Sequence, residues 1–517
     1  MSMTDDLHSA PERAQALAQK GEQADMQHRI DDAIAAYEES LEYSSESIAT
    51  YERLGRLYLE TSQYDAADTV AMTGLSLSDS AQLWALRSSV SQARYDVTNG
   101  IAFAQRAIEA DIESGYAWYA LTTAFGLAGD EFRADEALTD GLALAPNHPE
   151  LLAEAAMAPL NKPGEQVRRL REIVKTYPHN RNCRVSLALA LATQGDLDAA
   201  SLLREQILDC NPRDHAVRGV DAMYAALSGD FETARSAAAQ ALSIYAGSFY
   251  AHFALFHVAY ENWDDIAARD HLDAMHSLCS GTSLHTAFVS QAIELLDGPQ
   301  DALDLLADYA EQWPRATTAK AAMVDIAIRH GQLEDACAMT DTMRAAYPDR
   351  YDLFRTACQI RVEMQDAEGA LPMLTQIESA AERDYYSLRL QSIEDRDVEQ
   401  IKAAYEAHLE NYPSLDYAWG YLFRYAAEHS DEMAVCRMTE GPFRVPAGVR
   451  HATLAYVHSN QGRLEETRAA LDLLLAGSTV PRRWVWALEF ALEASMLPGL
   501  ESQYQELLRQ FGDSAHE

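Results

Sequence analysis

The side chains with the clearest chemical capacity are histidines gathered in residues 249–285. This stretch holds five of the sixteen histidines, six aromatic residues and Cys279. Imidazole and thiolate groups are the usual ligands of zinc. The histidines form two pairs, His252 with His257 and His271 with His276. Each pair is five residues apart, whereas two ligands on one helix face must be three or four apart. A metal site would therefore draw on two helices, for instance through His257, His271 and Cys279.

Two other interpretations of residues 249–285 remain open. Histidine and aromatic side chains fill the space between packed helices, and this structural role is the one we favour. The same residues are also suited to line a pocket for a small ligand. The sequence alone leaves packing, a metal or proton-sensing site, and a ligand pocket as alternatives.

Linear motifs of catalysis are absent from the sequence. It contains no GxxxxGK[ST], GxGxxG, HExxH or GxSxG segment and no EF-hand loop. The sequence therefore predicts neither a catalytic residue nor a cofactor, and we expect the protein not to be an enzyme.

A unit of about 34 residues recurs along the chain. Its helices must position any metal site or ligand pocket formed by residues 249–285. In one copy the landmarks are Trp118, Leu121, Thr122, Phe125, Ala134, Leu138, Gly141 and Pro146. This pattern of large and small residues on two helices, closed by proline, resembles the tetratricopeptide repeat (TPR) family. The resemblance extends over most of the chain, although many copies have lost the consensus residues.

Two independent landmarks keep the same register. Ala200 and Ala234, which open second helices, are 34 residues apart, and so are Pro178 and Pro212. Glycine before the second helix, as in Gly229-Asp-Phe231, supplies the left-handed conformation that ends the first helix. Alanine then lets the two helices of a unit approach closely.

The repeats predict an all-α fold, an α-solenoid with the right-handed superhelix of the TPR family, built from about 14 to 15 units. We expect a disordered stretch at residues 1–10, N-terminal units at 11–160 and central units at 161–440. Kinks are expected near residues 160, 280 and 385. A C-terminal unit with capping helices, which shields the open end of the array, should occupy 441–517.

The net charge of the chain limits the classes of molecule that it is expected to bind. With 41 basic and 80 acidic residues, the formal net charge is −39. Binding to nucleic acid or to an anionic membrane is disfavoured, because both need clustered cations. Three interpretations of the acidity remain open: it keeps the helical faces solvated, it complements a basic protein partner, or it reflects a salt-rich habitat or a GC-rich genome.

The six cysteines and the N-terminus bear on location. No two cysteines form a CxxC pair, so neither a zinc knuckle nor a redox motif is present. The first twenty residues lack the apolar core of a secretory signal, and no apolar stretch is long enough to span a bilayer. The sequence predicts a cytoplasmic protein without membrane insertion.

The family resemblance implies where a partner would bind. In TPR proteins the first helix of each unit lines a concave groove, and positions two, five, nine and twelve of that helix meet the ligand. Carried onto this chain, with a one-residue shift in the unit of His252, these positions give the candidate partner-binding residues Tyr116, Tyr119, Thr123, His252, Phe256, Arg355, Gln359, Tyr417, Arg424 and Tyr456.

The function predicted from the sequence is a non-catalytic scaffold that binds a partner protein or peptide in this groove. The alternative is a regulatory sensor that binds a small molecule or peptide signal. A metal-dependent enzyme, or a subunit of one, ranks third.

Overall fold

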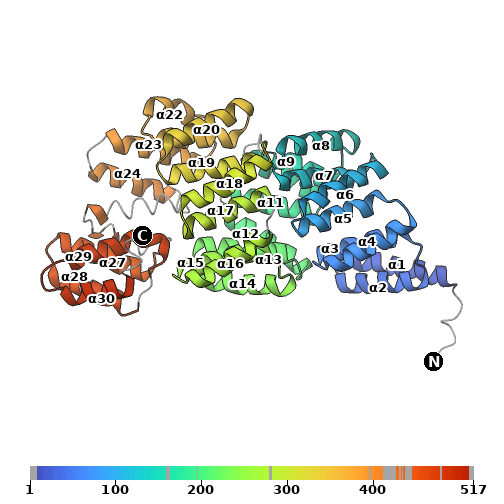
Figure 1. Cartoon of the computed structure of the whole chain (residues 1–517), viewed down its shortest axis with the longest axis horizontal. Helices are drawn as coiled ribbons and strands as arrows, with labels where there is room; N and C mark the ends of the chain where they lie inside the picture. Colours follow the sequence, from blue (N-terminus) through green and yellow to red (C-terminus); the bar gives the residue numbers. More distant parts are fainter. Residues whose placement is uncertain are drawn as a thin grey trace. The chain divides into compact units, whose positions relative to one another are not determined.

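The computed structural model consists of antiparallel helix pairs that follow one another along the chain (Figure 1). It describes residues 9–158, 163–194, 196–278, 282–394, 398–411, 427–429, 432–433, 435–436, 445–477 and 480–511. Within these residues all regular structure is helical. The predicted all-α solenoid is confirmed.

Each pair joins a first helix, A, to a second helix, B. The bounds of the helices are α1 (Ala10–Met26), α2 (Ile30–Tyr43), α3 (Ile48–Glu60), α4 (Tyr64–Leu77), α5 (Ala81–Ala93), α6 (Val97–Ala110), α7 (Gly115–Ala128), α8 (Glu131–Leu144), α9 (Pro149–Met157), α10 (Pro163–Thr176), α11 (Arg181–Gln194), α12 (Leu197–Cys210), α13 (His215–Ser228), α14 (Phe231–Ile244), α15 (Phe249–Glu261), α16 (Asp265–Leu278), α17 (Ser283–Leu296), α18 (Pro299–Gln312), α19 (Thr317–Arg329), α20 (Leu333–Ala346), α21 (Tyr351–Glu363), α22 (Ala367–Leu374), α23 (Ala380–Glu394), α24 (Val398–Asn411), α27 (Ala447–Asn460), α28 (Leu464–Leu475), the 3₁₀ turn η1 (Arg482–Trp484), α29 (Val485–Ser495) and α30 (Glu501–Phe511).

Small residues at 34-residue intervals hold each helix pair together. The alanines at positions 200, 234, 268, 302, 336 and 370, one near the start of each B helix, are all fully buried. A side chain larger than a methyl group would push helix A away from helix B, because the interior is close-packed. The size of the side chain is also limited at Gly141, since a Cβ atom there would lie 2.6 Å from the Cβ of Trp118. The 34-residue period therefore reflects the need for a small residue wherever helices A and B of a repeat touch.

The chain divides into two compact units. The first comprises Met1–Val258 and Ile266–Leu353, and the second comprises Ala259–Asp265 and Phe354–Glu517. In the second unit, Trp484, Leu488 and Leu471 belong to one apolar cluster, against which Trp263 packs. The Trp263 indole N–H also donates to the carbonyl of Val480 over 3.0 Å. Of the expected kinks, those near 160 and 280 coincide with residues 159–162 and 279–281, outside the described part of the chain. The expected division into three groups of repeats stays a prediction.

Within the first unit, turns about 151 residues apart touch one another. The Asn211 side-chain amide donates to the carbonyl of Glu60 over 2.6 Å. The Ser62 hydroxyl donates to the carbonyl of Arg213. The Nε2 atom of His28 lies 3.3 Å from the Nδ1 atom of His179. We call these contacts the seam. Each one joins the turn between helices A and B of one repeat to a connection four to five repeats further on, so the repeats of this unit wind back onto themselves.

Three residues at the seam adopt a backbone conformation that favours glycine. The turn after helix A has positive φ, and Gly129 and Gly229 occupy it at 73° and 85°. His28, Ser62 and Tyr95 adopt φ values of 55° to 64° at the matching turns. A non-glycine residue in this region costs on the order of 1 kcal/mol. All three side chains make seam contacts, with the Tyr95 hydroxyl accepting from the N–H of Phe249. These contacts offset the strain.

Buried histidines complete the seam. His215 is 4 % exposed, and its Nε2 is hydrogen-bonded to the Tyr64 hydroxyl over 2.6 Å. Burial lowers the pKa of His215 to about 4, against an opposing effect of Asp214, while Arg181 lowers it further. His285 packs against Tyr95 with ring centroids 4.7 Å apart, and burial lowers its pKa to about 3. Both imidazoles are neutral at pH 7.

The seam should weaken in mild acid. The unfolded chain takes up a proton at each histidine near pH 6.5, whereas His215 in the folded protein resists protonation down to about pH 4. The stability contributed by the neutral ring is complete above pH 6.5 and is lost as the pH falls below that value. Between pH 7 and pH 5, wild type should lose about 2 kcal/mol more unfolding free energy than His215→Gln. Urea denaturation followed by circular dichroism would measure this, and parallel pH profiles for the two proteins would contradict it.

Candidate functional site

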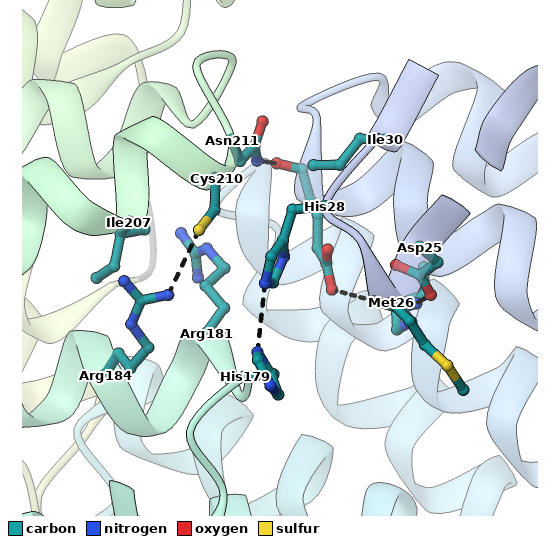
Figure 2. A pocket seen from close by; sticks show the side chains of 12 residues that line it. Asp25, Met26, His28, Ile30, His179, Arg181, Arg184, Ile207, Cys210 and Asn211 are labelled. Atoms are coloured by element: carbon teal, nitrogen blue, oxygen red, sulfur yellow. Dashed lines mark hydrogen bonds and ion pairs between the residues drawn. The ribbon is translucent and has the colours of Figure 1, made fainter. Parts of the chain in front are cut away.

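A cavity of about 480 Å³ opens beside the seam in the first unit. One side comes from the α1–α2 turn and the end of α3, and the other from α11 and the end of α12 (Figure 2). The lining residues are Asp25, Met26, His28, Ile30, Arg56, Glu60, His179, Arg181, Arg184, Ile207, Cys210 and Asn211. Because the two sides are far apart in sequence, the cavity exists only when the seam is closed.

The N-terminal side of the cavity carries surplus negative charge. Arg56 donates to Glu60 over 2.6 Å and also pairs with Asp25. Two carboxylates therefore share one guanidinium. The carboxylate side chains are each 27 % exposed, which leaves part of each within reach of a ligand.

The opposite side carries surplus positive charge. Arg181 is fully engaged, because two of its nitrogens donate to Asp214 over 2.6 and 2.9 Å. Asp214 is 2 % exposed, and the paired Arg181 lowers its pKa against the effect of burial. Arg184 differs, since the one hydrogen bond of its guanidinium among the described residues is a 3.8 Å contact to the Cys210 sulfur. A guanidinium has five N–H donors, so most of those of Arg184 are available.

Two tyrosines predicted as partner-binding residues lie close to this cavity. Tyr116 is 47 % exposed, and its ring meets His148 edge-on at 4.6 Å. Burial raises the pKa of Tyr116, and Glu150 and Glu60 raise it further while Arg56 lowers it. Since Arg56 and Glu60 line the cavity, Tyr116 lies within electrostatic range of it.

Tyr119, one turn further along α7, has a similar position. Burial raises its pKa, with smaller effects from Glu154, Glu150 and Arg181. Thr123, the third predicted residue of this helix, donates its hydroxyl to the carbonyl of Tyr119 over 3.0 Å. Tyr116 and Tyr119 thus lie within electrostatic range of the cavity residues Arg56, Glu60 and Arg181, none of which the sequence singled out.

The other predicted residues lie elsewhere. His252 Nδ1 is 3.2 Å from His271 Nδ1, and His252 Nε2 is 3.1 Å from the carbonyl of Ala246. Phe256 is fully buried and so belongs to the repeat packing, not to an accessible surface. The apolar packing of α15 explains this, because Phe253 on the same helix also packs against Phe288.

The remaining candidates fall in the second unit. Arg355 is exposed and donates to Glu382 over 3.0 Å, Gln359 is half-buried, and Tyr456 stacks on Phe490 at 4.1 Å. Tyr417 and Arg424 lie outside the described residues.

The described residues hold no group of three or more His, Cys, Asp and Glu side chains placed to bind a metal ion. Of the hypothetical metal ligands His257, His271 and Cys279, the last lies outside the described part of the chain.

Glu154 adds a titratable carboxyl to the neighbourhood of Tyr119. Burial raises its pKa to about 7, and no cation of the described residues lies within ion-pair distance of it. The folded protein therefore binds a proton at Glu154 that the unfolded chain releases near pH 4.5, so folding stability is lost as the pH rises from 4.5 through 7.

Removing this charge should stabilise the protein only at high pH. Glu154→Gln should unfold at a higher temperature than wild type at pH 8 and at nearly the same temperature at pH 4.5. Thermal denaturation at the two pH values would test this, with the exposed Glu172→Gln on α10 as control. An equal shift for both variants at pH 8 would show that Glu154 is not specially buried.

Similarity of this chain to known proteins is found among solved structures. No protein-family model matches the sequence, and no curated protein matches it as a relative. Among solved structures, the chain is similar to the APC/C hetero-tetramer Cut9–Hcn1, with 12% identity over 98% of this chain and 95% of that chain and a TM-score of 0.41. Yeast Tom70 is similar with 13% identity, 83% and 99% coverage and a TM-score of 0.33.

A thermophilic TPR protein of Thermus thermophilus is similar with 18% identity over 35% of this chain and 99% of that chain, at a TM-score of 0.31. With TM-scores below 0.5, these likenesses carry no argument about function. The chain's own features identify the architecture: antiparallel helix pairs, a 34-residue period and small residues between helices A and B. The described chain is an α-solenoid of tetratricopeptide-type repeats.

Proposed function

We propose that this protein is a non-catalytic scaffold that binds a segment of a partner protein at the cavity of the first unit. The observation that carries the proposal is the cavity itself, whose lining includes the open guanidinium of Arg184 and whose residues Arg56, Glu60 and Arg181 lie within electrostatic range of the two tyrosines on α7. Tyrosine and arginine are the residue types most enriched at the centres of protein interfaces. A volume of about 480 Å³ suits a few side chains of an extended segment.

Solenoid architecture supports the same proposal. Stacked repeats present many side chains along one extended surface, and such surfaces bind partners by several contacts of modest strength. Because the cavity spans two parts of the first unit that are joined by the seam, a bound segment would contact both of them. Binding should therefore also stabilise the closed form of this unit.

Charge and thiol content suit this role. The net charge of −39 favours encounter with a basic partner. The five described cysteines are free thiols, which fits a reducing compartment, and we infer a cytoplasmic location. None of the described helices combines the length and apolar character needed to cross a bilayer.

The alternative, a sensor of a small molecule, has one observation in its favour. The cavity volume lies within the range of small-molecule sites, and charged and apolar groups converge on it. The two functions differ in what a purified protein retains, since a sensor would bind a small metabolite without any protein partner.

Replacing Tyr116 should weaken partner binding without unfolding the protein. Tyr116→Ala removes a half-exposed ring, so we expect the amount of co-purified partner to fall about ten-fold while the melting temperature stays within a few degrees. The measurement is affinity isolation of the tagged full chain from its native lysate, with quantitative mass spectrometry and reconstitution from purified partner. The control is Tyr43→Ala, which removes a ring of similar exposure, 39 %, from α2. Equal recovery from both variants would contradict the proposed site.

A further inference from the structure

We infer that the cavity recognises a partner segment in which a basic and an acidic side chain lie close together. The basic group would face Asp25 and Glu60, and the acidic group would face Arg184. This inference rests on the proposed scaffold function and specifies the chemistry of the segment that the scaffold binds.

The two ends of the cavity differ in charge even though the lining as a whole is nearly balanced. Asp25, Arg56 and Glu60 together carry one net negative charge. Arg181 and Asp214 neutralise each other as a bidentate pair. Arg184 adds one positive charge that no carboxylate among the described residues approaches within 4 Å.

Figure 2 shows how these charges are arranged. Arg184 lies on one side of the cavity and Asp25 on the other, with His28 and His179 between them. The separation matters because the surplus charge at one end does not pair with the surplus charge at the other. A ligand that spans the cavity can pair with both ends at once.

The middle of the cavity supplies polar and apolar contacts. The His28 and His179 rings provide nitrogen donors and acceptors. Ile30 adds apolar surface, and Met26 is 70 % exposed on the N-terminal side. An unbranched thioether of this kind adapts to ligands of different shape. Such a lining fits the backbone and the aliphatic stems of charged side chains.

Ligands with a single charge fit this arrangement less well. A simple anion would pair with Arg184 and leave the surplus carboxylate charge at the other end uncompensated. A simple cation would leave Arg184 uncompensated. Because a partly buried charge without a partner costs free energy, the segment that satisfies both ends binds most tightly.

Selection from a random twelve-residue peptide library displayed on phage, with the full-length chain as bait, tests the inference. Enriched peptides should carry a Lys or Arg within about four residues of an Asp or Glu. On Arg184→Glu the acidic residue should disappear from the enriched set, because the charge that it meets has been reversed. The matched control Arg171→Glu reverses an exposed arginine of α10 and should leave the selection unchanged.

A second variant guards against misfolding of Arg184→Glu. Arg184→Gln keeps a polar side chain but removes its charge, and its circular dichroism and melting temperature should match those of wild type. Fluorescence anisotropy with one enriched synthetic peptide should show an approximately ten-fold higher Kd for Arg184→Gln than for wild type.

The outcomes separate this inference from the proposed function. Enriched peptides of one charge sign, or an enriched set that Arg184→Glu does not change, would overturn the two-charge inference and leave the scaffold proposal standing. Failure to enrich any peptide on the wild-type chain would overturn both.

Discussion

The structure depends on the close approach of the two helices in each repeat. Buried alanines at 34-residue intervals permit that approach and fix the angle between helices A and B. Because similar contacts recur from repeat to repeat, small rotations between neighbours add up along the chain. In the first unit they bring a repeat back against one that lies four to five repeats earlier. The seam and the cavity beside it are consequences of this accumulated rotation.

Among the described residues, the seam is held by polar contacts, by neutral histidines and by aromatic pairs such as Tyr64 with Tyr245. His28, Ser62 and Tyr95 have an unfavourable backbone conformation, and the contacts that their side chains make across the seam compensate for its cost. Neighbouring turns that use glycine, such as Gly129, bring the backbone itself close to Ser283. Each contact of this kind contributes little free energy. The closure of the first unit should therefore respond to pH and to a ligand bound in the cavity.

Periodicity predicted the helix pairs, but not the geometry of the cavity. The 34-residue spacing of Ala200, Ala234 and the later alanines was enough to predict helix pairs. The family resemblance also pointed to Tyr116 and Tyr119 on α7, close to the cavity. It also pointed to Phe256, which is buried because α15 packs tightly on its neighbour. Local spacing does not distinguish an exposed groove position from a packed one when the register is shifted.

The cavity residues Arg184, His28 and His179 escaped prediction for a different reason. Which repeats meet across the seam depends on the rotation per repeat, and no residue pattern within one unit encodes that angle. One signal was nevertheless present. His28 and Tyr95 occupy turn positions at which other repeats have glycine, so the departures marked places where the side chain has a role. In other solenoids, a non-glycine residue at a turn position where most repeats have glycine could identify a contact between repeats that are far apart in sequence.

Photocrosslinking from inside the cavity tests the central claim most directly. A benzoylphenylalanine residue at Met26, which lines the cavity and is 70 % exposed, should crosslink to one defined segment of a partner protein in cells. The same residue at Met72 on α4, which is 53 % exposed but does not line the cavity, should not crosslink to that segment. Crosslinks to the same segment from both positions, or from Met72 alone, would show that the partner binds elsewhere.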